Sequence, residues 1–122
     1  MILADTSVWI DHLRAGNKEM QQLLDQGQIV IHPFIIGELA LGSLRQRAKT
    51  VGLLDLLPQV RVAQLGEVRA MIEARRLYGL GIGLIDAHLI ASVFLSPSTL
   101  LWTRDKQLRK VTEVIGIHAN LA

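Results

Sequence analysis

Four acidic residues of this sequence stand apart from its ordinary charge pattern. Most of the eleven acids alternate with Lys or Arg on polar segments, and the four that do not are Asp5, Glu38, Asp86 and Asp105. Carboxylates gathered in one pocket repel one another, and a hard divalent cation relieves that repulsion. Mg²⁺ or Mn²⁺ held by such ligands activates water and stabilises displacement at a phosphodiester. The chemistry expected of this set is therefore metal-dependent hydrolysis of a nucleic acid.

Asp86 is the most informative of the four acids. It is the only acid between Glu73 and Asp105, in the segment GLIDAHLIASVF, and apolar residues follow it at the spacing of one helix face. A carboxylate on a buried stripe costs several kcal/mol unless it is paired or binds a cation. Its place in the first turn of a helix returns only about 0.3–1 kcal/mol. A functional role explains Asp86 better than a structural one.

The other three acids each have an ordinary structural reading. Glu38, in PFIIGELALG, could be a solvated helix residue, although no basic residue lies three or four positions away. Asp5 and Asp105 could simply cap the helices that follow them. However, both come directly after a predicted strand, and parallel α/β sheets place their sites at the carboxyl ends of strands. The two readings are compatible for both aspartates.

Short apolar runs alternate with amphipathic ones along the chain and predict the elements that position these acids. The five strands are expected at Met1–Ala4, Gln28–Ile31, Val60–Val62, Thr99–Thr103 and near Val114–Ile117. The helices are expected at Ser7–Arg14, Lys18–Asp25, Pro33 to about Arg47, Val51–Leu57, Gly66–Tyr78, Leu84–Leu95 and Lys106–Val111. This alternation favours an α/β fold with a mainly parallel central sheet.

The composition predicts one globular domain over residues 1–122, since half of the residues are hydrophobic. The absence of cysteine excludes a disulfide framework and a thiolate zinc site. The longest uncharged run, Ala87 to Thr103, is too broken to span a membrane, and no leader peptide is visible. A soluble, cytoplasmic protein is expected. The net charge of +2 permits a polyanionic partner without indicating one.

The sequence resembles PIN-domain proteins, and specifically the VapC-type toxin ribonucleases of bacterial toxin–antitoxin pairs. The resemblance runs along the whole chain and rests on four ordered motifs: ADTSVWIDHL, GELALG, LIDAHLIASV and LWTRDKQL. It implies a three-layer α/β/α fold whose central sheet has four to five strands. It also implies an endoribonuclease that depends on Mg²⁺ or Mn²⁺, cuts structured RNA such as transfer RNA, is silenced by a cognate antitoxin and forms a homodimer.

By the same motifs Asp5, Glu38, Asp86 and Asp105 take the acidic positions of that family. Thr6, Ser7 and Thr103 match its hydroxyl residues, which would orient carboxylates or water. Some PIN nucleases carry a further acid at the position of Gln107, so the resemblance implies one metal site here and does not extend to a second.

Several other signals remain open or weak. Arg104, Lys106 and Arg109 could contact RNA phosphates or could form a solvated helix face. The four histidines show no ligand spacing, and Gly79–Gly83 lacks the spacing of a dinucleotide-binding loop. Two alternatives to the nuclease stay open: a PIN-fold module that binds RNA or antitoxin with little turnover, and a phosphotransferase with Asp5 as nucleophile. Ser7, where a second acid would be expected, disfavours the phosphotransferase.

Overall fold

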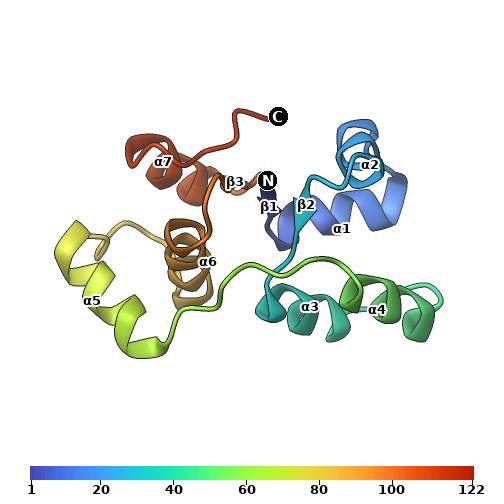
Figure 1. The fold of residues 1–122 in the computed structure, drawn as a ribbon, viewed down its shortest axis with the longest axis horizontal. Coiled ribbons are helices and arrows are strands. Elements are labelled where there is room, and N and C mark those ends of the chain that lie inside the picture. The colour runs from blue at the N-terminus through green and yellow to red at the C-terminus, as the bar shows by residue number, and fades with distance from the viewer.

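A computed structural model describes residues 1–122 and contains three strands and seven helices. The strands are β1 (Ile2–Ala4), β2 (Ile29–Val30) and β3 (Leu100–Trp102). The helices are α1 (Thr6–Ala15), α2 (Lys18–Asp25), α3 (Pro33–Ala40), α4 (Arg47–Asp55), α5 (Leu65–Arg75), α6 (Leu84–Leu95) and α7 (Lys106–Val114). Figure 1 shows α1 and α2 on one side of the strands, α5 to α7 on the other, and α3 and α4 below them.

The three strands form a parallel sheet in the order β2-β1-β3. Leu3 pairs with Val30 on one side and with Leu101 on the other, so β1 is the central strand. Leu3, Leu101 and Ala4 are fully buried, because helices cover the sheet, whereas Leu100 at the start of β3 is 38% exposed. All three strands therefore point their carboxyl ends toward the same edge, where Asp5 and Thr103 follow β1 and β3.

The prediction of four to five strands is wrong, because two of the expected strands are single bridges. Gln59 bridges to Ile31, and the backbone N–H of Val60 donates to the carbonyl of Ile31 (3.1 Å). The following N–H, that of Arg61, donates to the hydroxyl of Ser96 (3.1 Å), so the pairing ends there. At the other edge only His118 bridges, to Leu101. The chain cannot pair earlier there, since α7 continues to Val114 and Gly116, with φ of 78°, turns the backbone.

The expected helix from Pro33 to about Arg47 is also shorter, since α3 ends at Ala40. The guanidinium of Arg47 donates two hydrogen bonds, of 2.8 and 3.1 Å, to the carbonyl of Ala40. This contact satisfies one of the carbonyls that the end of α3 leaves open, and α4 starts at the same arginine. The remaining residues of the expected helix form the exposed turn between α3 and α4.

The main core, of 22 buried residues, lies around the sheet, and a second cluster of four buried residues lies where α5 packs on α6. Trp102, Leu3, Met20, Ile35 and Leu89 are among its fully buried side chains. None of the helices combines the length and the apolar composition that a membrane crossing requires.

Candidate active site

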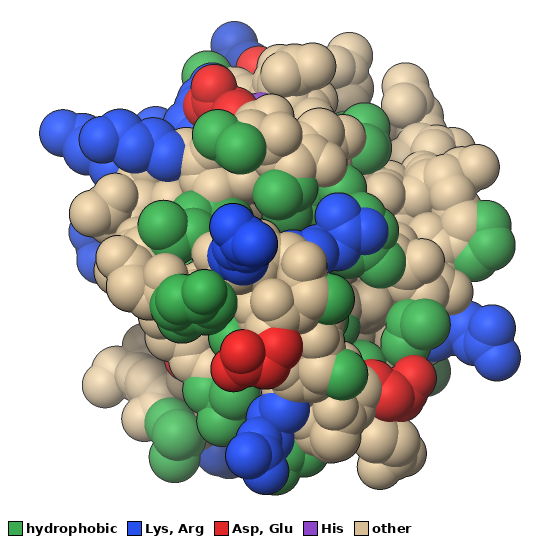
Figure 2. Space-filling model, turned by 90° about the vertical axis from the view of Figure 1, so that its left-hand side faces the viewer, with side chains coloured by type: hydrophobic (Ala, Val, Ile, Leu, Met, Phe, Trp, Pro, Cys, Tyr) green, Lys and Arg blue, Asp and Glu red, His purple; other side chains and the backbone are tan.

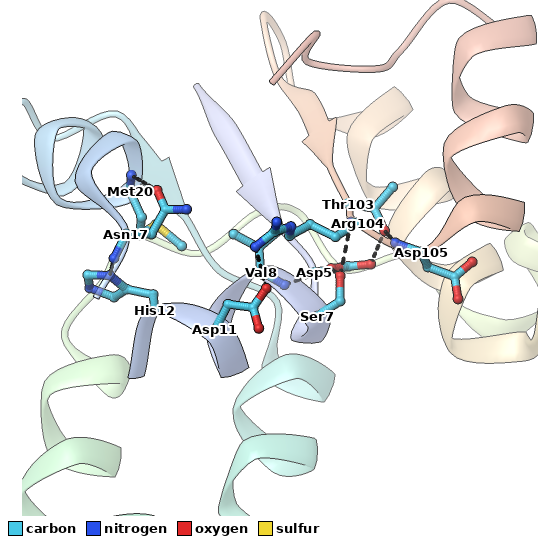
Figure 3. Close-up of polar contacts among 10 residues, drawn as sticks. All are labelled: Asp5, Ser7, Val8, Asp11, His12, Asn17, Met20, Thr103, Arg104 and Asp105. Carbon is cyan, nitrogen blue, oxygen red and sulfur yellow. Dashed lines mark hydrogen bonds and ion pairs between the residues drawn. The ribbon is translucent and has the colours of Figure 1, made fainter. Parts of the chain in front are cut away.

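Asp5 lies at the centre of the site, at the carboxyl end of the central strand. Its side chain is 6% exposed and accepts hydrogen bonds from the hydroxyls of Ser7 and Thr103 (Figure 3). It also accepts from the backbone N–H of Val8 (3.3 Å), which makes it the N-cap of α1. Burial raises the pKa of the Asp5 carboxyl above its usual value, although these hydrogen bonds act in the opposite direction. The protein thus holds this carboxylate in one place while withholding water from it.

The hydroxyls around Asp5 connect it to the loop that follows β3. Ser7 donates to Asp5 and accepts from the backbone N–H of Arg104 (3.0 Å), while Thr103 donates to Asp5 and accepts from the backbone N–H of Asp105 (3.0 Å). Each hydroxyl uses its donor and an acceptor lone pair, so the carboxylate and the loop fix each other. This network joins residues almost a hundred positions apart and sets the distance of Asp105 from Asp5.

Glu38 reaches the site from α3. It is exposed, and one of its carboxylate oxygens accepts a hydrogen bond from the hydroxyl of Thr6 (2.7 Å). Its other oxygen accepts no hydrogen bond from the chain, and no Lys or Arg forms an ion pair with it. Thr6, the first residue of α1, therefore orients Glu38 as Ser7 orients Asp5.

Asp86 and Asp105 enter from the first turn of α6 and the start of α7. Asp86 accepts from the backbone N–H of Gly83 (3.1 Å), and Asp105 caps α7 by accepting from the N–H of Leu108 (2.9 Å). Burial raises the pKa of the Asp86 carboxyl, and the negative charges of Asp105, Asp5 and Glu38 raise it further. Asp86 is therefore close enough to the other three acids to be repelled by them.

All four acids line one open cavity of about 360 Å³. The rest of its wall consists of hydroxyl, glycine and apolar residues, with no Lys or Arg among them: Thr6, Ser7, Gly83, Leu84, Ile85 and Leu89. We call this cavity the acidic pocket. No three of its carboxylates are close enough together to form a ready-made cation shell. Three of the four acids are instead bonded to backbone N–H groups of their own helices.

The oxygen atoms that line the acidic pocket are suitable ligands for a hard divalent cation. Carboxylate and hydroxyl oxygens are the ligands that Mg²⁺ and Mn²⁺ prefer, and no basic side chain in the pocket wall neutralises the carboxylates. Their mutual repulsion adds to the effect of burial in raising the pKa of Asp86. At the position of a possible further acid, the Gln107 side chain packs against Gly81, whose φ is 78°. An amide at this position offers a weaker ligand than a carboxylate would.

The predicted RNA-contacting residues have different partners. Arg104 forms an ion pair with Asp11 of α1, and Arg109 forms one with Glu113 (3.0 Å), whereas Lys106 forms none. Asp11 was not singled out from the sequence. It lies one helical turn after Ser7, and this i+4 spacing is the signal that places both beside the β3–α7 loop.

Two buried histidines lie near the same edge of the sheet. His32 follows β2, accepts from the N–H of Phe34 (2.9 Å) through Nδ1, and contacts the ring of His88 at 6.5 Å between centroids. Burial lowers the pKa of His32 to about 4, and the neighbouring His88 contributes. Neither histidine lines the acidic pocket.

Comparison with known proteins gives concordant results. A family model described as PIN domain matches residues 2–114. The chain is 45% identical over 117 residues to Ribonuclease VapC32 of Mycobacterium tuberculosis strain CDC 1551 / Oshkosh, which covers 96% of this chain and 94% of that protein. Ribonuclease VapC32 of strain ATCC 25618 / H37Rv gives the same identity and coverage.

Proposed function

The chain belongs to the PIN-domain family and to the VapC ribonucleases within it, and we propose that it is the toxin of a toxin–antitoxin pair, an endoribonuclease whose acidic pocket binds Mg²⁺ or Mn²⁺. One observation carries the proposal: four carboxylates from α3, α6 and the ends of two strands line one cavity that no basic residue neutralises. The substrate is RNA, and structured RNA such as transfer RNA is the class that fits the family resemblance.

The cation, when bound, would supply an activated water and stabilise the charge that develops on the leaving oxygen. Asp5, Glu38, Asp86 and Asp105 are the residues that would hold it. Ser7 and Thr103 keep Asp5 directed into the pocket, and Thr6 does the same for Glu38. Asp86 and Asp105 each have one carboxylate oxygen bonded to a backbone N–H and a second that accepts no hydrogen bond from the chain. Those free oxygens are available as ligands.

The proposed partners are the RNA, a cognate antitoxin and a second copy of the chain, all in the cytoplasm. Exposed apolar side chains support a protein partner, because Leu41 and Leu56, next to the ends of α3 and α4, are 89% and 81% exposed.

Cleavage of RNA by the purified protein tests the nuclease. We expect cleavage with Mn²⁺ or Mg²⁺, loss of cleavage in excess chelator, and loss in Asp5→Asn and Asp86→Asn. Asp55→Asn is the matched control, because Asp55 is an exposed acid at the end of α4 and lies outside the acidic pocket. Full activity of Asp5→Asn, or cleavage that chelator leaves unchanged, would contradict the proposal.

The open arrangement of the acids favours one second candidate, a module that binds RNA or antitoxin with little turnover. No three carboxylates form a cation shell as they stand, so turnover requires their side chains to close on the ion. Titration calorimetry with Mn²⁺ separates the two candidates. The nuclease predicts binding that Asp86→Asn weakens and Asp55→Asn preserves, whereas the module predicts RNA binding without a specific Mn²⁺ isotherm.

A further inference from the structure

A second cavity opens beside the acidic pocket and shares Glu38 with it. Its volume is about 560 Å³, and it lies among α1, the end of α3 and the turn that leads into α4. Its wall includes Ile10, Leu13, Arg14, Leu39, Ser43 and Arg45. We call this cavity the arginine groove. Because Glu38 belongs to both walls, a chain that leaves the acidic pocket past Glu38 enters the groove directly.

The charge of the groove is opposite to that of the acidic pocket. Arg14 and Arg45 are exposed, and neither forms an ion pair, in contrast to Arg104 and Arg109. Glu38 is the only acid in the groove's wall, and it lies at the border with the acidic pocket. Two guanidinium groups without acidic partners match the bidentate geometry of phosphate oxygens.

Helix α1 connects the two cavities along one face. Ser7, Ile10 and Arg14 are spaced at i, i+3 and i+7, so they lie on the same face over about two turns. Ser7 lines the acidic pocket, and Ile10 and Arg14 line the groove. Ile10 is 42% exposed and offers an apolar surface between the two polar ends. Along this face of α1, the acidic pocket is followed by the apolar side chain of Ile10 and then by the positive charge of Arg14.

We propose that the arginine groove binds the RNA strand on one side of the scissile phosphate, and this rests on the proposed nuclease function. Arg14 and Arg45 contact successive phosphates, while sugars or bases lie against Ile10 and Leu13. Continuity with the acidic pocket and the two unpaired arginines favour a polyanionic strand over a polypeptide as the occupant. These contacts position the strand and do not read its sequence.

The surface of α5 offers a control. In Figure 2 the face formed by α5 to α7 carries acidic, basic and apolar side chains interspersed across its centre, and basic side chains gather at its upper left edge. A shallow cavity on α5 contains Arg69, which forms no ion pair, together with Glu73 and Ala70, and it shares no residue with the acidic pocket. Arg69→Gln removes one positive charge, as each of the two groove substitutions does, on a helix where no RNA is expected.

The test measures binding of a fluorescein-labelled single-stranded RNA of randomised sequence as a function of salt. All proteins carry Asp5→Asn, so that the RNA is not cut. Arg14→Gln with Arg45→Gln removes two phosphate contacts, and the slope of log K against log salt should become shallower by about 1.4. The affinity deficit at 50 mM salt should therefore shrink about sevenfold by 200 mM. Arg69→Gln should change the slope by less than about 0.35, which is half the value expected for one phosphate contact.

A second measurement does not depend on the arginine variants. The chain has no cysteine, so Ser43→Cys in the groove and Ala70→Cys on α5 each give a unique attachment point for a photo-crosslinker. We expect RNA crosslinks from position 43 and not from position 70. Equal slopes for the double variant and Arg69→Gln, or equal crosslinking at both positions, would overturn the proposal.

Failure of the nuclease function gives a different result. Cleavage is assayed separately on chains that retain Asp5, in Mn²⁺ and in chelator. If the wild-type chain does not cut RNA, the proposed nuclease activity is refuted. If the salt dependence of RNA binding still changes in the groove variant, the proposed binding surface stands.

Discussion

The hydroxyl of Thr103 provides the sharpest test of how the site is held together. Thr103 is fully buried, donates to the carboxylate of Asp5 and accepts from the N–H of Asp105. Thr103→Val keeps the shape of the side chain and replaces the hydroxyl with a methyl group. A hydrogen bond to a charged partner contributes about 1.5–3 kcal/mol, so we expect a loss of about 2 kcal/mol at pH 7. For a domain of this size, that loss lowers the melting temperature by roughly 6–10 °C.

The dependence of this loss on pH identifies its cause. Burial already raises the pKa of Asp5, and Thr103→Val raises it further, because the lost hydrogen bond favoured the ionised carboxylate. The stability difference between variant and wild type is therefore largest where Asp5 is ionised in the folded protein. It decreases as the pH falls through the folded pKa, since a neutral carboxyl loses only about 1 kcal/mol of hydrogen bonding.

The assay is thermal unfolding between pH 3 and 8 in chelator, with Thr103→Ser as the matched control. The serine keeps the hydroxyl and loses one buried methyl group, which costs about 1 kcal/mol at every pH. Cleavage by Thr103→Val should also fall about 10–100-fold, because a residue that orients a ligand typically affects activity by that factor. The same loss of stability in both variants, independent of pH, would refute the reasoning.

Three further predictions concern other charged groups. In chelator at pH 7, Asp86→Asn should unfold at a higher temperature than wild type, because burial and three neighbouring carboxylates raise the pKa of Asp86. The gain should disappear as the pH falls below 3.8, where the carboxyl is protonated in both the folded and the unfolded protein. A pH series of melting curves checks this. The ring of His32 should stay neutral down to about pH 4 in NMR titrations of the folded protein. Its contribution to stability is therefore complete above pH 6.5 and is lost as the pH falls from 6.5 toward 4, because only the unfolded chain takes up the proton in that range. A ring that titrates near 6.5 in the folded protein would contradict this. The ion pair between Asp11 and Arg104 has both side chains 44% exposed, so Asp11→Asn should lower the free energy of unfolding by less than about 1 kcal/mol in urea titrations, and a larger loss would show that the pair is not solvated.

Elements defined by strong local signals were predictable from the sequence. The bounds of α2 and α6 agree with the prediction, since apolar spacing and Pro97 or Gly27 mark both helices clearly. The early end of α3 was not predictable, because its carbonyl of Ala40 is satisfied by a side chain from Arg47, and no local pattern encodes that contact. The two predicted edge strands were wrong for a related reason, because an apolar run in the sequence does not show over how many residues a strand is paired.

The acids could be selected from the sequence because unpaired carboxylates among apolar residues are rare. That Asp86 faces the charges of Asp105, Asp5 and Glu38 agrees with placing them in one pocket. The ion pair of Arg104 with Asp11 joins positions 93 apart and depends on how α1 lies against the loop after β3. Glu38 lines both cavities only because of how the helices pack, so the arginine groove could not be predicted from the sequence motifs.

The backbone bonds of Asp5, Asp86 and Asp105 also constrain how this chain can change during evolution. Each of these acids accepts a hydrogen bond from an N–H in the first turn of a helix or just before it, so each carboxylate also helps to start that helix. Replacement by alanine would remove a helix-starting hydrogen bond worth about 1 kcal/mol together with the oxygen proposed to bind the cation, whereas asparagine or serine would remove the charge and keep an acceptor. A lineage that abandoned RNA cleavage but kept the fold should therefore drift toward Asn or Ser at these three positions. At Glu38, which bonds to no backbone group, no such preference for Asn or Ser is expected.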